Sequence, residues 1–206
     1  MQARMLYALV VVVPIVMYAV FRTCRYRFAP KVAHLLGMAS YWVVLSAISL
    51  ATLGRTGIRQ VVESFPDLGA ALWLVLALPV VLAFAFGPFA KQLPLVTPTV
   101  FLLSAALAVV NASLEECFWR GVYVHYFSSP LTAWLFPAVG FAIWHFAPLS
   151  VLPYKRGSVF FVLSSFFLGL CWGFVAFKTK SIGWNIVSHI LVDFSGFGAL
   201  LYLGRR

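Results

Sequence analysis

Six of the side chains that can carry charge cluster at helical spacings in three long apolar stretches of this sequence. They are Glu115, Glu116, Arg120, His145, His189 and Asp193. If those stretches cross a membrane, each charge costs roughly 2.5–3.5 kcal/mol at the bilayer centre by insertion scales. Such residues usually face the interior of a helix bundle or a wet cavity, where they pair with one another. Their presence in only three stretches therefore predicts one shared polar site.

The spacing of the first three residues indicates that Glu116 pairs with Arg120, whereas Glu115 points in another direction. Glu116 and Arg120 are four residues apart, so they share one face of a helix, with the acid on the amino-terminal side, which is the more favourable order. Glu115 is rotated from that face by about 100°. We therefore expect Glu116 and Arg120 to form a supporting pair and Glu115 to be free for chemistry.

The two histidines lie on helix faces with suitable neighbours. Phe141 and His145 are four residues apart, as are His189 and Asp193, and Asn185 extends the second stripe by one turn. A glutamate and a histidine in a pocket of low dielectric can activate a water molecule. A second histidine can donate a hydrogen bond to a developing oxyanion. This set of residues predicts a hydrolase.

A serine or cysteine nucleophile is not indicated. No serine or cysteine has a base at motif spacing, and Ser188 adjoins His189, although neighbours along a helix point away from each other. Asn111 matches no motif, but it lies one turn before Glu115 and is expected to border the site.

The composition places these residues in a membrane. The 206 residues are 63% hydrophobic and 10% charged, whereas a soluble domain is about half apolar and about a quarter charged. A membrane-spanning helix needs roughly 20 mainly apolar residues. The sequence therefore predicts an all-α, polytopic transmembrane helix bundle with about seven, or eight, spans.

Seven apolar stretches can be marked, and the charged and turn-forming residues lie between them. The fourth stretch is too long for one upright span, so it is either tilted or extended by an interfacial helix. The first is followed by arginines without a small-x-small cleavage site, which favours a span over a signal peptide. The stretches cover residues 5–21, 33–53, 68–90, 96–127, 131–147, 159–177 and 182–203.

The formal charge of +10 is distributed in short clusters between the apolar stretches. Such clusters reflect the positive-inside rule and anionic lipids, so we expect no nucleic-acid partner. With the amino terminus outside, the inner segments hold nine basic residues: Arg22, Arg25, Arg27, Lys31, Lys91, Lys155, Arg156, Arg205 and Arg206. The outer segments hold five: Arg4, Arg55, Arg59, Lys178 and Lys180. We therefore expect a multi-pass integral membrane protein with its amino terminus outside, which would lie in the plasma (inner) membrane if the source is a prokaryote.

The motifs resemble one family when they are taken together. In order, they are EExxxR at Glu115, FxxxH at His145 and HxxxD at His189. This order resembles the CPBP family of CAAX proteases and bacteriocin-processing enzymes, which includes the type II CAAX prenyl endopeptidases. The resemblance covers about residues 96–203. We therefore divide the chain into amino-terminal transmembrane helices, 1–95, and a catalytic CPBP-like core, 96–206.

The resemblance implies a role for each motif residue. Glu115 and His145 would activate the attacking water, and His189 and Asp193 would form the oxyanion site. This sequence carries Asp193 where the prenyl-protein proteases carry asparagine. An ionised aspartate cannot donate to an oxyanion, so Asp193 is either protonated or orients His189.

The resemblance leaves two readings of the cofactor. Members of the family have been described as metalloproteases and as metal-independent glutamate proteases. We favour the reading with no cofactor, because His-Glu-x-x-His is absent and no spacing demands a metal. The alternative is a zinc ion held by Glu115, His145 and His189 with an open coordination position.

The predicted function is an intramembrane endopeptidase of glutamate type. Its partners would be the lipid bilayer and a membrane-associated peptide or protein substrate, carrying a prenylated CAAX-type tail, a leader peptide or a sorting tail. Two alternatives remain open: a non-enzymatic scaffold or immunity factor of the same fold, and a proton-coupled transporter that uses the same residues as a relay. No inverted repeat supports the transporter.

Overall fold

The computed structural model describes residues 2–154 and 156–203, and every regular element within them is helical. Lys155, Arg205 and Arg206, which contribute to the predicted charge bias, lie outside the described residues. The elements are α1 (Gln2–Arg27), α2 (Pro30–Val62), α3 (Ala70–Phe86), α4 (Phe89–Gln92), a 3₁₀ turn (Leu93–Leu95), α5 (Pro98–Glu116), a π-helical segment (Cys117–Val122), α6 (Tyr123–Tyr126), a second π-helical segment (Leu131–Leu135), α7 (Phe136–Trp144), α8 (Phe146–Leu149), α9 (Ser158–Thr179), α10 (Gly183–Ser195) and α11 (Leu200–Leu203).

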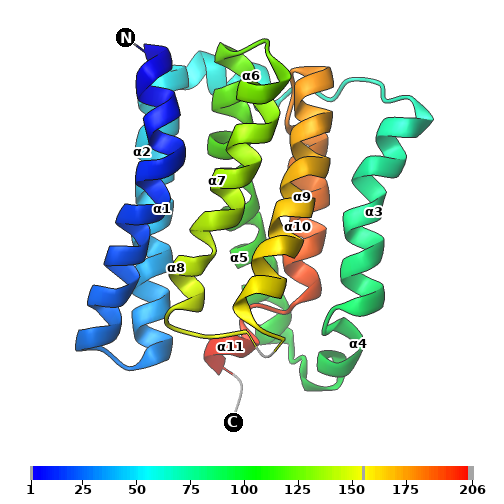
Figure 1. Cartoon of the computed structure of the whole chain (residues 1–206). Helices are drawn as coiled ribbons and strands as arrows, with labels where there is room; N and C mark the ends of the chain where they lie inside the picture. Colours follow the sequence, from blue (N-terminus) through cyan, green and yellow to red (C-terminus); the bar gives the residue numbers. More distant parts are fainter. Residues whose placement is uncertain (1, 155, 204–206) are drawn as a thin grey trace.

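The long helices run alternately up and down in one bundle (Figure 1). Six of them are long and apolar enough to cross a membrane, and a seventh span results if the bent pair of α3 and the segment Phe89–Leu95 is counted as one. This architecture confirms the predicted all-α polytopic bundle. The fourth apolar stretch forms one continuous candidate span, Pro98–Tyr126, so it does not supply an eighth.

Helix α2 corrects one predicted boundary. The polar segment that begins at Gly54 is expected to be a break, but the helix resumes and continues to Val62. Gly54 adopts φ 63° and ψ 176°, a backbone conformation that residues with a side chain rarely take, so the helix kinks there without ending. Beyond the kink Gly57 and Val61 are buried while Arg55 is exposed, so this turn of helix is amphipathic.

Large aromatic side chains are buried at the centre of the bundle, and its outer surface is also apolar. Trp119, Phe141, Trp144 and Trp172 are buried among α5, α7, α9 and α10. Large apolar side chains elsewhere are exposed, for example Val43 at 69%. An apolar surface of this kind is favourable against lipid and unfavourable in water, which is why the helices can leave it uncovered.

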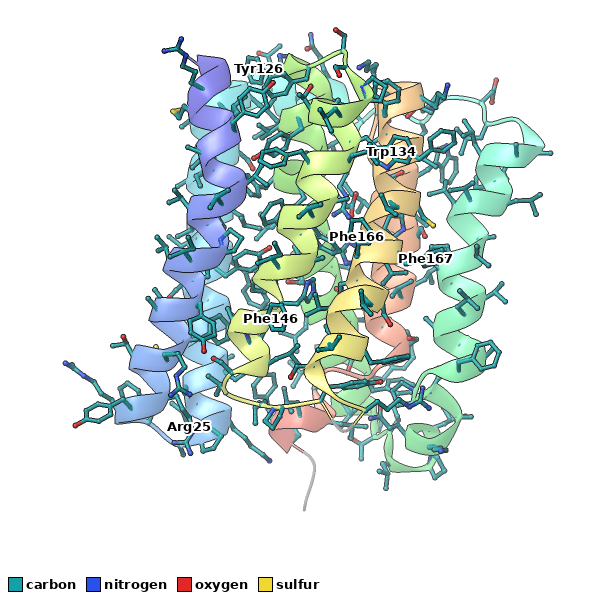
Figure 2. The ribbon with its side chains drawn as sticks, in the orientation of Figure 1. Arg25, Tyr126, Trp134, Phe146, Phe166 and Phe167 are labelled. Carbon is teal, nitrogen blue, oxygen red and sulfur yellow. The ribbon has the colours of Figure 1, made fainter. Side chains whose placement is uncertain are left out.

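The exposed charged residues collect at the two ends of the bundle. Arg25 marks one end, and Tyr126 lies at the other (Figure 2). The turn between α1 and α2, the helix α4 and the loop before α9 share the end of Arg25 (Figure 1), and they carry most of the basic residues assigned above to the inner segments. The alternation of the helices therefore agrees with the grouping of loops used to predict the orientation.

Close packing between α1 and α7 depends on Gly140. A Cβ atom at Gly140 would lie 2.6 Å from Val10 Cγ1 and 2.7 Å from Trp119 Cζ3. We expect Gly140→Ala to lower the free energy of unfolding by about 1–3 kcal/mol, because packed atoms must move to accommodate the methyl group. Gly69→Ala is the control, since nothing lies within 4 Å of a Cβ there. Thermal unfolding in detergent checks this, and an unchanged midpoint for Gly140→Ala would contradict the packing.

Candidate active site

The end of α5 carries the acidic pair, and a π-helical segment follows it. Glu115 and Glu116 are the last two residues of α5, and Arg120 lies within Cys117–Val122. π-Helical turns are frequent at functional sites. Arg120 Nη1 lies 3.0 Å from Glu116 Oε1, and both side chains are almost fully buried. The spacing of four residues therefore predicts this pair correctly.

Arg120 is held by an aromatic ring as well as by the acid. Its guanidinium carbon lies 4.1 Å from the centre of the Phe141 ring, a cation–π contact that can strengthen when water is excluded. Its contact with Glu116 is an ion pair rather than a well-directed hydrogen bond, because among the described residues neither terminal guanidinium nitrogen has a hydrogen-bond partner of good geometry.

Glu116 joins α5 to α10. His189 Nδ1 lies 2.9 Å from Glu116 Oε1, and Asn185 Nδ2 donates to Glu116 Oε2 at 3.3 Å. Asn185 and His189 are one turn apart on α10, as the predicted stripe requires. Three side chains thus surround the buried Glu116 carboxylate. Of these three, only Arg120 is predicted as a partner from the sequence spacing.

The imidazole of His189 is fixed on its flat face by Trp172. The two rings are stacked, with their centres 4.0 Å apart. Trp172 Nε1 donates to Ser188 Oγ at 3.0 Å, and Ser188 Oγ donates to the carbonyl of Leu76 in α3 at 2.9 Å. The Ser188 hydroxyl is therefore committed to two structural hydrogen bonds, which agrees with its exclusion as a nucleophile.

The second nitrogen of His189 faces two further carboxylates. His189 Nε2 lies 3.5 Å from Glu115 Oε2 and 3.5 Å from Asp193 Oδ1. With Glu116 on Nδ1, carboxylates stand at both ring nitrogens. An imidazolium donates from both nitrogens, so this arrangement suits a charged His189.

Glu115 is expected from the sequence to have no structural partner, but two side chains donate hydrogen bonds to it. Tyr41 Oη donates to Glu115 Oε1 at 3.0 Å, and Asn111 Nδ2 donates to Glu115 Oε2 at 3.2 Å. Tyr41 Oη in turn accepts from Trp119 Nε1 at 2.7 Å. These donors suit an ionised Glu115, and they fix the direction of its oxygens.

His145 lies at the carboxyl end of α7, beside the cluster. Its Nδ1 is 2.7 Å from the carbonyl oxygen of Phe141, so Nδ1 carries the proton and Nε2 keeps the lone pair. The Phe141 ring is 4.9 Å from the His145 ring and 6.0 Å from the His189 ring, measured between centres. In the described part of the chain, no direct hydrogen bond joins His145 to Glu115.

The sequence reasoning misses Trp172 and, on α2, Tyr41 and Trp42. Tyr41 is fully buried, holds Glu115 and stacks on Trp144 with ring centres 3.7 Å apart. The available signal is a pair of aromatic residues with polar tips in mid-span, since buried tyrosine and tryptophan usually need a partner. Among the chain's eight tyrosines and seven tryptophans, that signal does not single them out.

The described residues contain no group of three histidine, cysteine, aspartate or glutamate side chains placed to hold a metal ion. Glu115, His145 and His189 were the predicted alternative ligands. His145 Nδ1 is engaged with a backbone carbonyl, and both nitrogens of His189 face carboxylates. Contacts of this kind at Nδ1 are also usual for histidines that bind a metal through Nε2, so the zinc alternative stays a prediction.

Comparison of the sequence with models of protein families gives one match, and the matched segment includes this site. Residues 97–195 match the model of the Rce1-like family, described as type II CAAX prenyl endopeptidase Rce1-like. This segment, just under half of the chain, is therefore similar to the Rce1-like family. No curated protein and no solved structure gives a significant match to the chain.

The match to the Rce1-like family confirms the resemblance to CAAX proteases and supports a membrane protease in general. The matched segment contains all six charged residues with which the sequence analysis began, from Glu115 to Asp193. Tyr41 and Trp42 lie outside it, so the structure adds contacts from α2 to those of the Rce1-like segment.

Loss of the buried cation is expected to be far more costly than loss of an exposed one. In Arg120→Met, Glu116 loses its nearest cation while it remains buried, and we expect a loss of about 3–5 kcal/mol of stability. The matched control is Arg59→Met, because Arg59 and Glu63 are also four apart but are 78% and 71% exposed. We expect that control to cost less than about 1 kcal/mol. Equal unfolding midpoints for the two variants would show that the Arg120 pair contributes little.

Proposed function

We propose that the protein is an intramembrane endopeptidase that cleaves a membrane-associated or lipidated substrate with a water molecule activated by Glu115 and His145. The observation that supports this most directly is the convergence of Glu115 and Asp193 on His189 inside an apolar bundle. A charged cluster at this depth is costly, and function is the usual reason for retaining one.

Activation of the water is assigned to Glu115. Its carboxylate takes a proton from the water, and the resulting hydroxide attacks the carbonyl carbon of the scissile bond. The same carboxyl group then returns the proton to the leaving amine as the tetrahedral intermediate collapses. His145 is assigned to hold the water, because its Nε2 keeps a lone pair when Nδ1 donates to the Phe141 carbonyl.

Stabilisation of the intermediate is assigned to His189. Glu116 anchors Nδ1, so the Nε2–H bond has a fixed direction and can donate to the oxyanion. Asp193, 3.5 Å from Nε2, is assigned to orienting His189 rather than to donating, because an ionised carboxylate has no proton to give. Glu116 and Arg120 act through His189 and are supporting residues.

The route of the substrate follows from differences in exposure. Glu115 and His189 are 1% and 3% exposed, whereas the side chain of Asp193 is 27% exposed and His145 is half-buried. We place the scissile bond on the side of Asp193 and His145. A peptide held close to the bilayer by a lipid or a hydrophobic tail fits such a site; a prenylated CAAX-type tail is the first candidate, followed by a leader peptide and a sorting tail.

The proposal contains no step through a metal ion. Each role is assigned to a protein group, Glu115, His145 or His189, and none requires the alternative zinc ion. In this mechanism Glu115 activates the water as a general base, which is the task that a zinc ion would otherwise perform as a Lewis acid.

Glu115→Gln is expected to lower the cleavage rate at least about a thousandfold, because the amide cannot take the proton of the water. Wild-type and variant proteins would be expressed in the native host lacking its own copy. Mass spectrometry of protein termini in the membrane fraction would then compare the two. A terminus that forms only with the wild type identifies the substrate and the cut site.

The matched control is Val109→Ala, because Val109 lies on the same helix and is 47% exposed to the bilayer side. It should leave processing unchanged. Identical termini from wild type and Glu115→Gln, at equal protein levels, would refute proteolysis by Glu115 and favour a scaffold or transporter.

Removal of metal is expected to leave activity intact. The purified protein would be treated with a strong zinc chelator, and cleavage of a synthetic peptide spanning the identified cut site would be measured before and after. We expect rates within about twofold of each other, because no protein group needs an ion to act. Loss of cleavage on chelation, with recovery on adding zinc, would restore the three-ligand alternative.

A further inference from the structure

Asn111 lies between two carboxylates that come from different helices. Its Nδ2 donates to Asp193 Oδ2 of α10 at 2.9 Å and to Glu115 Oε2 of α5 at 3.2 Å. A side-chain amide has two N–H donors on one nitrogen. Asn111 can therefore satisfy both carboxylates at once.

Trp42 of α2 decides which way the Asn111 amide points. Trp42 Nε1 lies 2.9 Å from Asn111 Oδ1. An indole nitrogen only donates, so the atom facing it must be the amide oxygen and not the nitrogen. The orientation of the amide is therefore fixed by chemistry, and both N–H donors are left for Glu115 and Asp193.

The electrostatics of the cluster explain why a neutral double donor is useful at this position. Glu115, Glu116 and Asp193 surround His189, while Arg120 pairs with Glu116. Glu115 and Asp193 both approach His189 Nε2 and repel each other if both are ionised. An amide between them separates the two oxygens and bonds to each without adding charge.

We propose that Asn111 is a positioning residue that holds Glu115 and Asp193 in register across α5 and α10, and that Trp42 sets its orientation. This inference rests on the proposed function. It extends the site to α2, which lies outside the matched segment 97–195. Asn111 itself is half-buried and is assigned no proton transfer.

The kinetic test uses the synthetic peptide spanning the cut site. In Asn111→Leu the bridge is lost, and we expect kcat to fall by about ten- to a hundredfold, as small misplacements of reacting groups do. KM should stay within about twofold, because the bridge does not touch the substrate. Val109→Ala on the lipid side of the same helix is the control.

A swap of the two residues tests the bridge itself. Asn111→Asp alone places a third carboxylate beside Glu115 and Asp193 and should be at least as inactive as Asn111→Leu. Combining it with Asp193→Asn restores an amide opposite a carboxylate between α5 and α10, although position 111 no longer donates to Glu115, so the swap tests the Asn111–Asp193 half of the bridge. We expect the double variant to recover at least about tenfold over Asn111→Asp, whereas a side chain that only fills space would not show such coupling.

A spectroscopic measurement tests the Trp42 contact without any substrate. The indole ¹⁵N–¹H signal of Trp42, assigned by its loss in Trp42→Phe, should move in Asn111→Leu and stay in place in Val109→Ala. An unmoved signal overturns the contact and the proposal with it.

The outcomes separate this proposal from the proposed function. If the wild type cleaves but Asn111→Leu cleaves equally well, the role of Asn111 is refuted and the protease stands. If KM rises while kcat is unchanged, Asn111 acts in binding and the positioning role is refuted. If the wild type forms no new terminus, the proposed function fails and the role of Asn111 falls with it.

Discussion

Glu116 is buried where neither water nor lipid head groups can reach it, and the arrangement of the site depends on how its charge is balanced. A carboxylate in such a place is tolerable only when cations and donors surround it. Arg120, His189 and Asn185 perform this task from the π-helical segment and from α10. Glu116 thereby links α5 to α10, and the other acids are placed around the same imidazole.

Aromatic residues hold the charged side chains of the site in fixed positions. Trp172 stacks on His189, Phe141 covers Arg120, and Tyr41 lies flat on Trp144 while it bonds to Glu115. Rings with polar tips are suited to this task, because they fill apolar space and still present one donor. Amino-terminal α2 takes part through Tyr41 and Trp42. The division into residues 1–95 and 96–206 therefore remains a prediction about the chain, whereas the polar cluster draws on both parts.

Local periodicity predicts the parts of this molecule that depend on one helix. The apolar stretches give the spans, and spacing of four residues gives the Glu116–Arg120 pair and the shared face of His189 and Asp193. The contact of Tyr41 with Glu115 joins residues 74 apart in sequence, and no local pattern encodes it. The bond between Glu116 and His189 is missed for the same reason. The helical turn beyond Gly54 is missed because its charges resemble a loop, although they lie on the exposed face of an amphipathic helix.

Helix α3 is tied to this centre by a different kind of bond. The Ser188 hydroxyl reaches the backbone carbonyl of Leu76, and Leu76 and Pro79 are the buried residues of this helix. Every amino acid supplies a carbonyl, so the tie to α10 does not depend on which side chain occupies position 76. The lipid-facing side chains of α3 can therefore diverge in sequence while the helix keeps its place beside the imidazole-bearing α10.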